Sequence, residues 1–157
     1  MAQSAIYEKS RQGREPVLCV LGGTGCGKST LCHLLTGSDP RKEHRFFHAK
    51  SSANSVTRVV EIKTGLNWFD GEGKLTLVDC PGLADSSGAD QHILDKMVGD
   101  LRQVPFIDIF VLMMSADRLA ARDLIQNMKT YEGLCGGRAV WSNIVIVIPR
   151  RDYNPME

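Results

Sequence analysis

The chain has 157 residues, of which 43% are hydrophobic and 24% charged, and its 19 basic side chains nearly balance 18 acidic ones. This length and composition predict one globular domain over residues 16–157, preceded by a polar, flexible lead-in over residues 1–15. The net charge of +1 excludes a general basic footprint for nucleic acid. No apolar stretch approaches the roughly 20 residues that span a bilayer. Five cysteines without a C-x-x-C pair indicate reduced thiols and a cytoplasmic protein.

The first predicted element is a buried strand over residues 17–21, where apolar residues follow one another without alternation. A glycine-rich turn and then a helix follow, with Leu31, Leu34 and Leu35 at helical spacing and Gly37 at the C-cap position. Strand, glycine loop and helix therefore follow one another in that order.

Residues 38–55 are predicted to form a long polar loop in which His44 and His48 are solvated. Residues 56–68 and 74–79 have strand character on either side of a short turn, so we expect an antiparallel pair. The remaining elements are predicted as a helix over residues 90–102, a buried strand over 107–114, a helix over 119–131 and a buried strand over 143–148.

Strands that alternate with helices predict an α/β fold, a doubly wound and mostly parallel sheet with one antiparallel strand. In such sheets ligands bind outside the carboxyl ends of the strands. The segments that directly follow each strand are therefore the predicted ligand-binding segments.

The most specific motif fills residues 22–29, which match G-x-x-x-x-G-K-[ST] in full. Glycines let the backbone turn tightly and direct N–H groups at phosphate oxygens, beside a helix N-terminus that favours negative charge. Lys28 is predicted to act on the β- and γ-phosphates as a catalytic residue, and the Ser29 hydroxyl to coordinate Mg²⁺. The predicted nucleotide contacts of this P-loop are Gly23, Thr24, Gly25, Cys26, Gly27, Lys28, Ser29 and Thr30.

Asp79 ends a predicted strand and opens Asp79-Cys80-Pro81-Gly82, the D-x-x-G pattern of GTPases. An acidic residue at this position can hold Mg²⁺ through water, and the Gly82 N–H can bind the γ-phosphate. The alternative is an acidic cap on a turn, which the upstream P-loop disfavours.

Thr57 is the candidate for the threonine that reaches Mg²⁺ and the γ-phosphate only in the triphosphate state of a switch GTPase. It lies just before a predicted strand and is assigned a catalytic and metal-binding role. Ser52 and Ser55 are competitors for that role, and an ordinary surface threonine is the alternative.

Residues 149–152 follow a predicted strand at the place where GTPases carry [NT]-K-x-D. In that pattern the aspartate accepts hydrogen bonds from the guanine N–H and amino groups, which adenine cannot supply, so Asp152 is assigned to the base. Arg150 replaces the usual lysine, an exchange that is not equivalent, and Pro149 replaces Asn or Thr. A charged loop after a strand is the alternative.

Taken together, these motifs resemble the immune-associated nucleotide-binding GTPases, the GIMAP family, and more distantly the chloroplast import receptor GTPases. The most specific likeness is Ala116-Asp117-Arg118-Leu119 with Asp123, followed by Tyr131-Glu132-Gly133 and Trp141. The resemblance covers about residues 16–153. It implies a G domain that binds GTP or GDP with Mg²⁺ and pairs as a nucleotide-dependent homodimer. The later strand and helices of a complete G domain have no counterpart, so we expect a C-terminally incomplete domain.

Leu83 occupies the position where Ras-like proteins carry a glutamine that orients water. We therefore predict a guanine-nucleotide switch protein that hydrolyses GTP slowly, with the missing catalytic group supplied by self-association or a partner. Arg118 is a candidate for a contact to the nucleotide or the partner, and an ordinary surface arginine is the alternative. Two alternative functions remain: a nucleotide-bound scaffold without meaningful turnover, and an ATP-using P-loop enzyme such as a small kinase.

Overall fold

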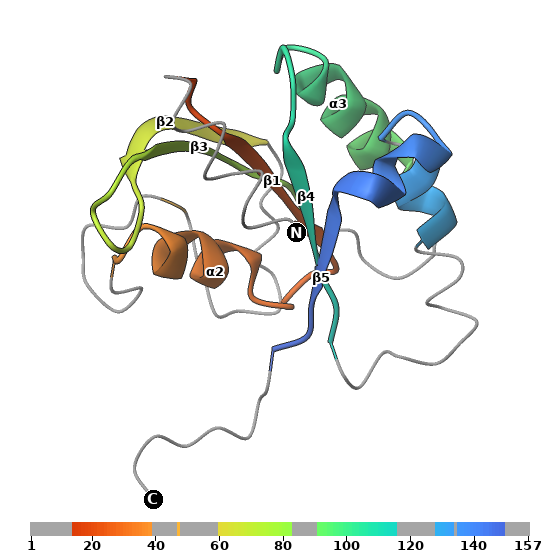
Figure 1. Cartoon of the computed structure of the whole chain (residues 1–157). Helices are drawn as coiled ribbons and strands as arrows, with labels where there is room; N and C mark the ends of the chain where they lie inside the picture. Colours follow the sequence, from red (N-terminus) through yellow and green to blue (C-terminus); the bar gives the residue numbers. More distant parts are fainter. Residues whose placement is uncertain are drawn as a thin grey trace, which may run out of the picture.

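The computed structural model describes residues 14–38, 47, 60–82, 91–115, 128–133 and 135–149, with only the backbone described for 91–94. Within these residues a five-stranded sheet has the order β2-β3-β1-β4-β5 (Figure 1). The strands are β1 (Val17–Gly22), β2 (Glu61–Asn67), β3 (Lys74–Asp79), β4 (Ile109–Met113) and β5 (Ile144–Val147). The helices are α2 (Lys28–Leu35), α3 (Gln91–Leu101) and the 3-10 helix η3 (Arg138–Asn143).

Strand β1 lies at the centre of the sheet and pairs in parallel with β3 on one side and with β4 on the other. Strand β5 pairs in parallel with β4, whereas β2 is antiparallel to β3 and brings Glu61 opposite Asp79. The predicted fold class, a mostly parallel sheet with one antiparallel strand, is confirmed.

Helices cover both faces of the sheet, with α2 on one side and α3 on the other (Figure 1). On the α2 side, Cys32 packs in a cluster with Val20 and Leu77. On the opposite side, Met97 and Tyr131 pack against the other face of the strands. Because β1 is covered on both faces, it is buried along its whole length, as its uninterrupted apolar sequence predicts.

Helix α2 ends in the predicted glycine turn, which fixes the position of its last residues. Gly37 has a φ of 65°, in the left-handed region that favours glycine. Its N–H donates to the carbonyl of Leu34 at 3.1 Å, and the N–H of Ser38 donates to the carbonyl of His33 at 2.9 Å. These two bonds form a Schellman motif that satisfies the last carbonyls of the helix.

Strand β5 differs from its prediction, because it is not a buried strand. Val145 and Ile146 are 36% and 49% exposed. The physical reason is that β5 is the outermost strand on its side of the described sheet, with β4 as its neighbour. An apolar run alone does not show whether a strand lies at the centre or at the edge of a sheet.

Two further predicted elements are described only in part. Strand β2 begins at Glu61, and residues 56–59 lie outside the described part of the chain. Residues 128–133 are helical at the end of the predicted 119–131 helix, the earlier part of which lies outside the described residues. Among the described residues, no helix is long and apolar enough to cross a membrane.

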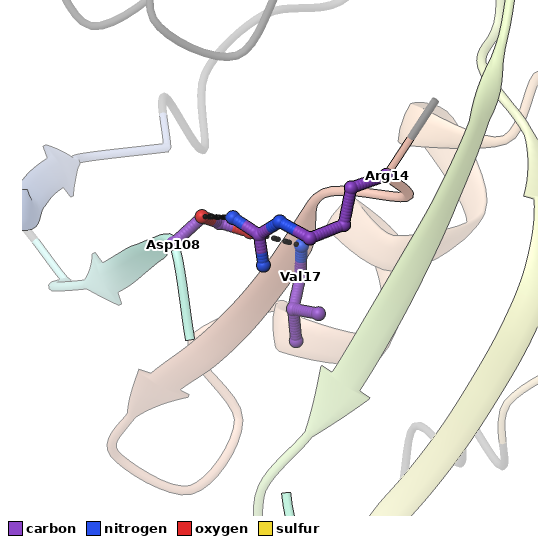
Figure 2. A network of polar contacts seen from close by, with 3 residues as sticks. All are labelled: Arg14, Val17 and Asp108. Atoms are coloured by element: carbon purple, nitrogen blue, oxygen red, sulfur yellow. Dashed lines mark hydrogen bonds and ion pairs between the residues drawn. The ribbon is translucent and has the colours of Figure 1, made fainter. Parts of the chain in front are cut away.

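Arg14 and Glu15, the last two residues of the predicted lead-in, contact the domain. The Arg14 guanidinium donates to Oδ1 of Asp108 at 2.7 Å, and Oδ2 of the same carboxylate accepts the Val17 N–H at 2.9 Å (Figure 2). The Gly65 N–H donates to the Glu15 carboxylate. Residues 1–13 lie outside the described part of the chain, so the domain boundary stays a prediction.

Candidate functional site

The P-loop leaves β1 at Gly22 and enters α2 at Lys28. Gly27, directly before the helix, has a φ of 93°, which a residue with a side chain rarely adopts. Its carbonyl accepts the N–H of Leu31 at 2.9 Å and so begins the helical ladder. The first turn of α2, with the positive end of its dipole, therefore borders the loop.

Lys28 and Gly82, which the two motifs assign to the phosphates, lie beside each other at this loop. Lys28 is buried, and its Nζ donates to the carbonyl of Gly23 at 2.9 Å. The Thr24 hydroxyl donates to the carbonyl of Gly82 at 3.2 Å. A Cβ atom on Gly82 would lie 2.7 Å from the Cα of Thr24 and 2.9 Å from Nζ of Lys28. Only glycine fits at position 82 without displacing the P-loop.

Ser29 and Asp79 form the second contact between the two motifs. The Ser29 hydroxyl donates to Oδ2 of Asp79 at 2.6 Å. Asp79 is 1% exposed, and its Oδ1 has no hydrogen-bond partner within the described residues. Burial raises the pKa of Asp79, while the Ser29 hydrogen bond and the charge of Lys28 act in the opposite direction.

These two residues fit a hydrated Mg²⁺ ion. A buried carboxylate oxygen without a partner costs about 1–3 kcal/mol, which a cation or its water would offset. Hydroxyl and carboxylate oxygens are ligands that Mg²⁺ prefers, and the ion keeps several waters and phosphate oxygens for its other positions. The described residues hold no cluster of three or more His, Cys, Asp or Glu side chains suited to a metal. A Mg²⁺ site built from one carboxylate beside a phosphate-binding loop does not need such a cluster, because phosphate oxygens and waters supply the other ligands.

Cys26 occupies the inner side of the P-loop and is not accessible as a thiol. It is 6% exposed, and a Cβ atom on Gly22 would lie 2.8 Å from its Sγ. Burial raises the pKa of the Cys26 thiol, which therefore stays protonated at neutral pH. A nucleotide contact at this position would use the backbone N–H. Gly25 of the same loop and Thr30 in the first turn of α2 are exposed.

Thr57 and Asp152 lie outside the described residues, as do Leu83, Arg118 and Arg150. Their predicted roles toward the γ-phosphate, the metal, the base and catalysis stay predictions.

The segment that resembles the GIMAP family is described only from residue 128 onward. There the structure brings its Trp141 to Glu132, because the indole Nε1 donates to the Glu132 carboxylate at 3.2 Å. Tyr131 is buried in the adjoining core, and burial raises the pKa of its hydroxyl. This part of the segment therefore has a packing role on the face of the sheet opposite α2.

His33 and Phe47, whose side chains meet in the core, belong to none of the predicted motifs. Both are 0% exposed, His33 Nε2 lies 3.2 Å from the Phe47 carbonyl oxygen, and the rings meet edge to face with centroids 5.9 Å apart. The available signal was that His33 follows Ser29 by four residues and so shares its face of α2.

Comparison with known proteins identifies the family. Residues 17–156 match the AIG1 family. The chain belongs to the AIG1 family. It is also 32% identical to Septin-5 of Rattus norvegicus over 82 residues, and 36% identical to Septin-2B of Xenopus laevis over 85 residues. These matches cover 52% of the chain but only 22% and 23% of the two septins.

Solved structures support the fold. Toc33 from Arabidopsis thaliana, solved as a dimerization-deficient mutant, superposes with a TM-score of 0.65 at 16% identity, over 99% of this chain and 59% of that one. Era from Aquifex aeolicus, bound to GDP and AlF4⁻, superposes with a TM-score of 0.55 at 21% identity, over 87% of this chain and 40% of that one. The fold is therefore that of a P-loop G domain.

Proposed function

We propose that this chain binds GTP or GDP together with Mg²⁺ and acts as a guanine-nucleotide switch. The observation that carries the proposal is the pair of Ser29 and Asp79, with a buried carboxylate oxygen that lacks a partner within the described residues. Lys28 and Gly82 lie beside each other at the same loop. Lys28 would neutralise the β- and γ-phosphates, while Ser29 and Asp79 would hold the ion.

The guanine base is proposed to be read by Asp152. Support comes from its place after β5 and from the likeness of the fold to Era, which was solved bound to GDP and AlF4⁻. Adenine lacks the amino and N–H groups that an aspartate would accept from guanine. Thr57 is proposed to join the metal and the γ-phosphate in the triphosphate state.

Hydrolysis is proposed to be slow in the monomer and faster on self-association. The sequence has Leu83 where a water-orienting glutamine stands in Ras-like proteins. The chain resembles in fold a Toc33 variant described as dimerization-deficient, which supports testing for a homodimer. The second candidate is a scaffold that retains nucleotide without turnover, which Leu83 also favours.

The identity of a bound nucleotide tests the main proposal. We expect purified, folded protein to release GDP or GTP on denaturation, and the nucleotide-free protein to show calorimetric heat with GDP plus Mg²⁺ but not with ADP. Folded protein that is empty and gives no heat with either purine nucleotide would contradict it.

The dependence of phosphate release on protein concentration separates the switch from the scaffold. A dimer-activated enzyme must accelerate more than linearly with concentration, whereas a scaffold shows no turnover at any concentration. The GIMAP branch of the family and a cytoplasmic location are also proposed. All five cysteines lie in the described residues and are free, in agreement with a reducing compartment.

A further inference from the structure

Two buried acceptor atoms lie between α2 and the sheet without a hydrogen-bond partner among the described residues: Nδ1 of His33 and Oδ1 of Asp79. His33 is 0% exposed and Asp79 is 1% exposed, so bulk water does not reach either side chain. Such unpaired buried groups are rare in native structures and call for an explanation.

The two side chains occupy one neighbourhood. The Ser29 hydroxyl binds the other carboxylate oxygen of Asp79 at 2.6 Å, and His33 lies one helical turn beyond Ser29 on the same face of α2. The imidazole therefore lies one helical turn from the serine that binds the carboxylate proposed to hold Mg²⁺.

The Phe47 carbonyl determines which nitrogen of His33 carries the hydrogen. A carbonyl oxygen can only accept, so Nε2, at 3.2 Å from it, is the donor. In the neutral ring this leaves a lone pair on Nδ1. Nδ1 of His33 and Oδ1 of Asp79 are then both acceptors and cannot bond to each other. A water molecule, with two O–H donors, satisfies both.

We propose that His33 is a positioning residue for the metal-binding carboxylate, with one water molecule donating to both Nδ1 of His33 and Oδ1 of Asp79. The proposal rests on the proposed Mg²⁺ function of Asp79. Phe47 contributes by holding the imidazole in this tautomer through its carbonyl and by packing against the ring. Groups that orient metal ligands in this way change metal affinity about 10–100-fold when they are replaced.

Two substitutions of similar size separate the two nitrogens of the ring. His33→Asn keeps an acceptor near the position of Nδ1 and loses the Nε2 donor, whereas His33→Gln keeps a donor near Nε2 and loses the Nδ1 acceptor. We expect the Mg²⁺ concentration for half-maximal retention of labelled GDP to rise about tenfold in His33→Gln. In His33→Asn it should stay within about twofold of the unchanged chain. GDP affinity measured in EDTA should be the same in all three proteins.

The opposite order, with His33→Asn impaired and His33→Gln unchanged, would show that His33 acts only by anchoring Phe47 and would overturn the proposal. Equal Mg²⁺ dependence in all three proteins would overturn it too. A chain without Mg²⁺-dependent GDP retention would instead refute the proposed function.

A second measurement needs no variant and no metal. Nitrogen-15 NMR of the unchanged, metal-free protein, at a pH where the His33 ring is neutral, should show the ring hydrogen on Nε2 and none on Nδ1. A hydrogen on Nδ1 would remove the acceptor on which the proposal depends, even if both variants failed to fold.

Discussion

Asp79 and Asp108 are two buried aspartates at opposite ends of the central strands, and their hydrogen bonds differ. Asp79 is the last residue of β3, where Oδ2 accepts from Ser29 while Oδ1 has no partner within the described residues. Asp108 directly precedes β4, and Arg14 and the Val17 N–H satisfy its two oxygens (Figure 2). The Asp108 N–H also donates to the Val17 carbonyl at 2.9 Å.

Both carboxylates are buried, so burial does not distinguish their roles. Their hydrogen bonds do. A carboxylate with both oxygens satisfied inside the fold fixes the arrangement of the chain, here the junction between the first residues of β1 and β4. A carboxylate with one oxygen that no described protein group satisfies leaves that oxygen to a water molecule or to a ligand. We therefore assign Asp108 to stability and Asp79 to binding.

The largest effect is expected from removing the P-loop ammonium. Lys28→Ala should weaken GTP binding about 10³-fold, or about 4 kcal/mol, because the phosphates lose their buried charge partner. Titration of a fluorescent GTP analogue measures it. Lys74→Ala is the matched control, because Lys74 is exposed at the far end of β3. Equal affinity in Lys28→Ala and Lys74→Ala would refute the role of Lys28.

Asp108→Ala tests the structural role assigned to Asp108, whose two carboxylate oxygens accept hydrogen bonds from Arg14 and Val17. It leaves the Val17 N–H unpaired in a buried site, so we expect a loss of about 2–3 kcal/mol in the free energy of unfolding by urea. Arg14→Ala should cost less, because the Arg14 side chain is 38% exposed and solvent screens its ion pair. Neither change should alter GDP affinity. A loss of GDP binding without a loss of stability would reverse the assignment.

Gly82→Ala tests the contact between the two motifs. The added Cβ would meet the backbone of Thr24 at 2.7 Å, so one of the two segments must move. We expect a loss of about 1–2 kcal/mol in stability together with weaker nucleotide binding. Gly99→Ala in α3 is the control, since a Cβ there has open space, and it should gain about 0.5–1 kcal/mol. Unchanged nucleotide affinity in Gly82→Ala would contradict the close approach.

Asp79→Asn should raise the melting temperature of the metal-free protein, and Mg²⁺ should no longer stabilise it. Removing a cost of about 1 kcal/mol corresponds to about 2–4 °C for a domain of this size. Burial raises the pKa of Asp79 above its ordinary value of 3.8, so the folded protein favours the protonated carboxyl group. The stability that Asp79 contributes through this protonation is fully present below pH 3.8. The contribution is lost as the pH rises through the raised pKa.

Differential scanning calorimetry in EDTA between about pH 4 and pH 7 measures this dependence. The difference in melting temperature between Asp79→Asn and the unchanged chain should widen toward neutral pH. A lower melting temperature for Asp79→Asn at neutral pH would show that Asp79 is a structural carboxylate like Asp108.

The local parts of the site could be predicted from the sequence because short spacings encode them. The P-loop glycines, the proximity of Lys28 to Gly82 and the pairing of Ser29 with Asp79 follow from motifs at the ends of parallel strands. The partnership of His33 with Phe47 could not be predicted, because it joins positions 14 residues apart through a polar loop without a period. The exposure of β5 depends on its neighbours in space, which its apolar sequence does not specify.

Strand β5 has a practical consequence for any assay that varies protein concentration. Its exposed Val145 and Ile146, together with Ile148 just beyond it, give one border of the described sheet a surface on which a second chain can add a strand. Aggregation through this edge strand would resemble nucleotide-dependent dimerisation in a sedimentation or turnover experiment. Ile146→Lys places a charge on the edge strand and should block this aggregation. Dimerisation that persists in the Ile146→Lys variant therefore occurs through another surface, such as the nucleotide-binding face.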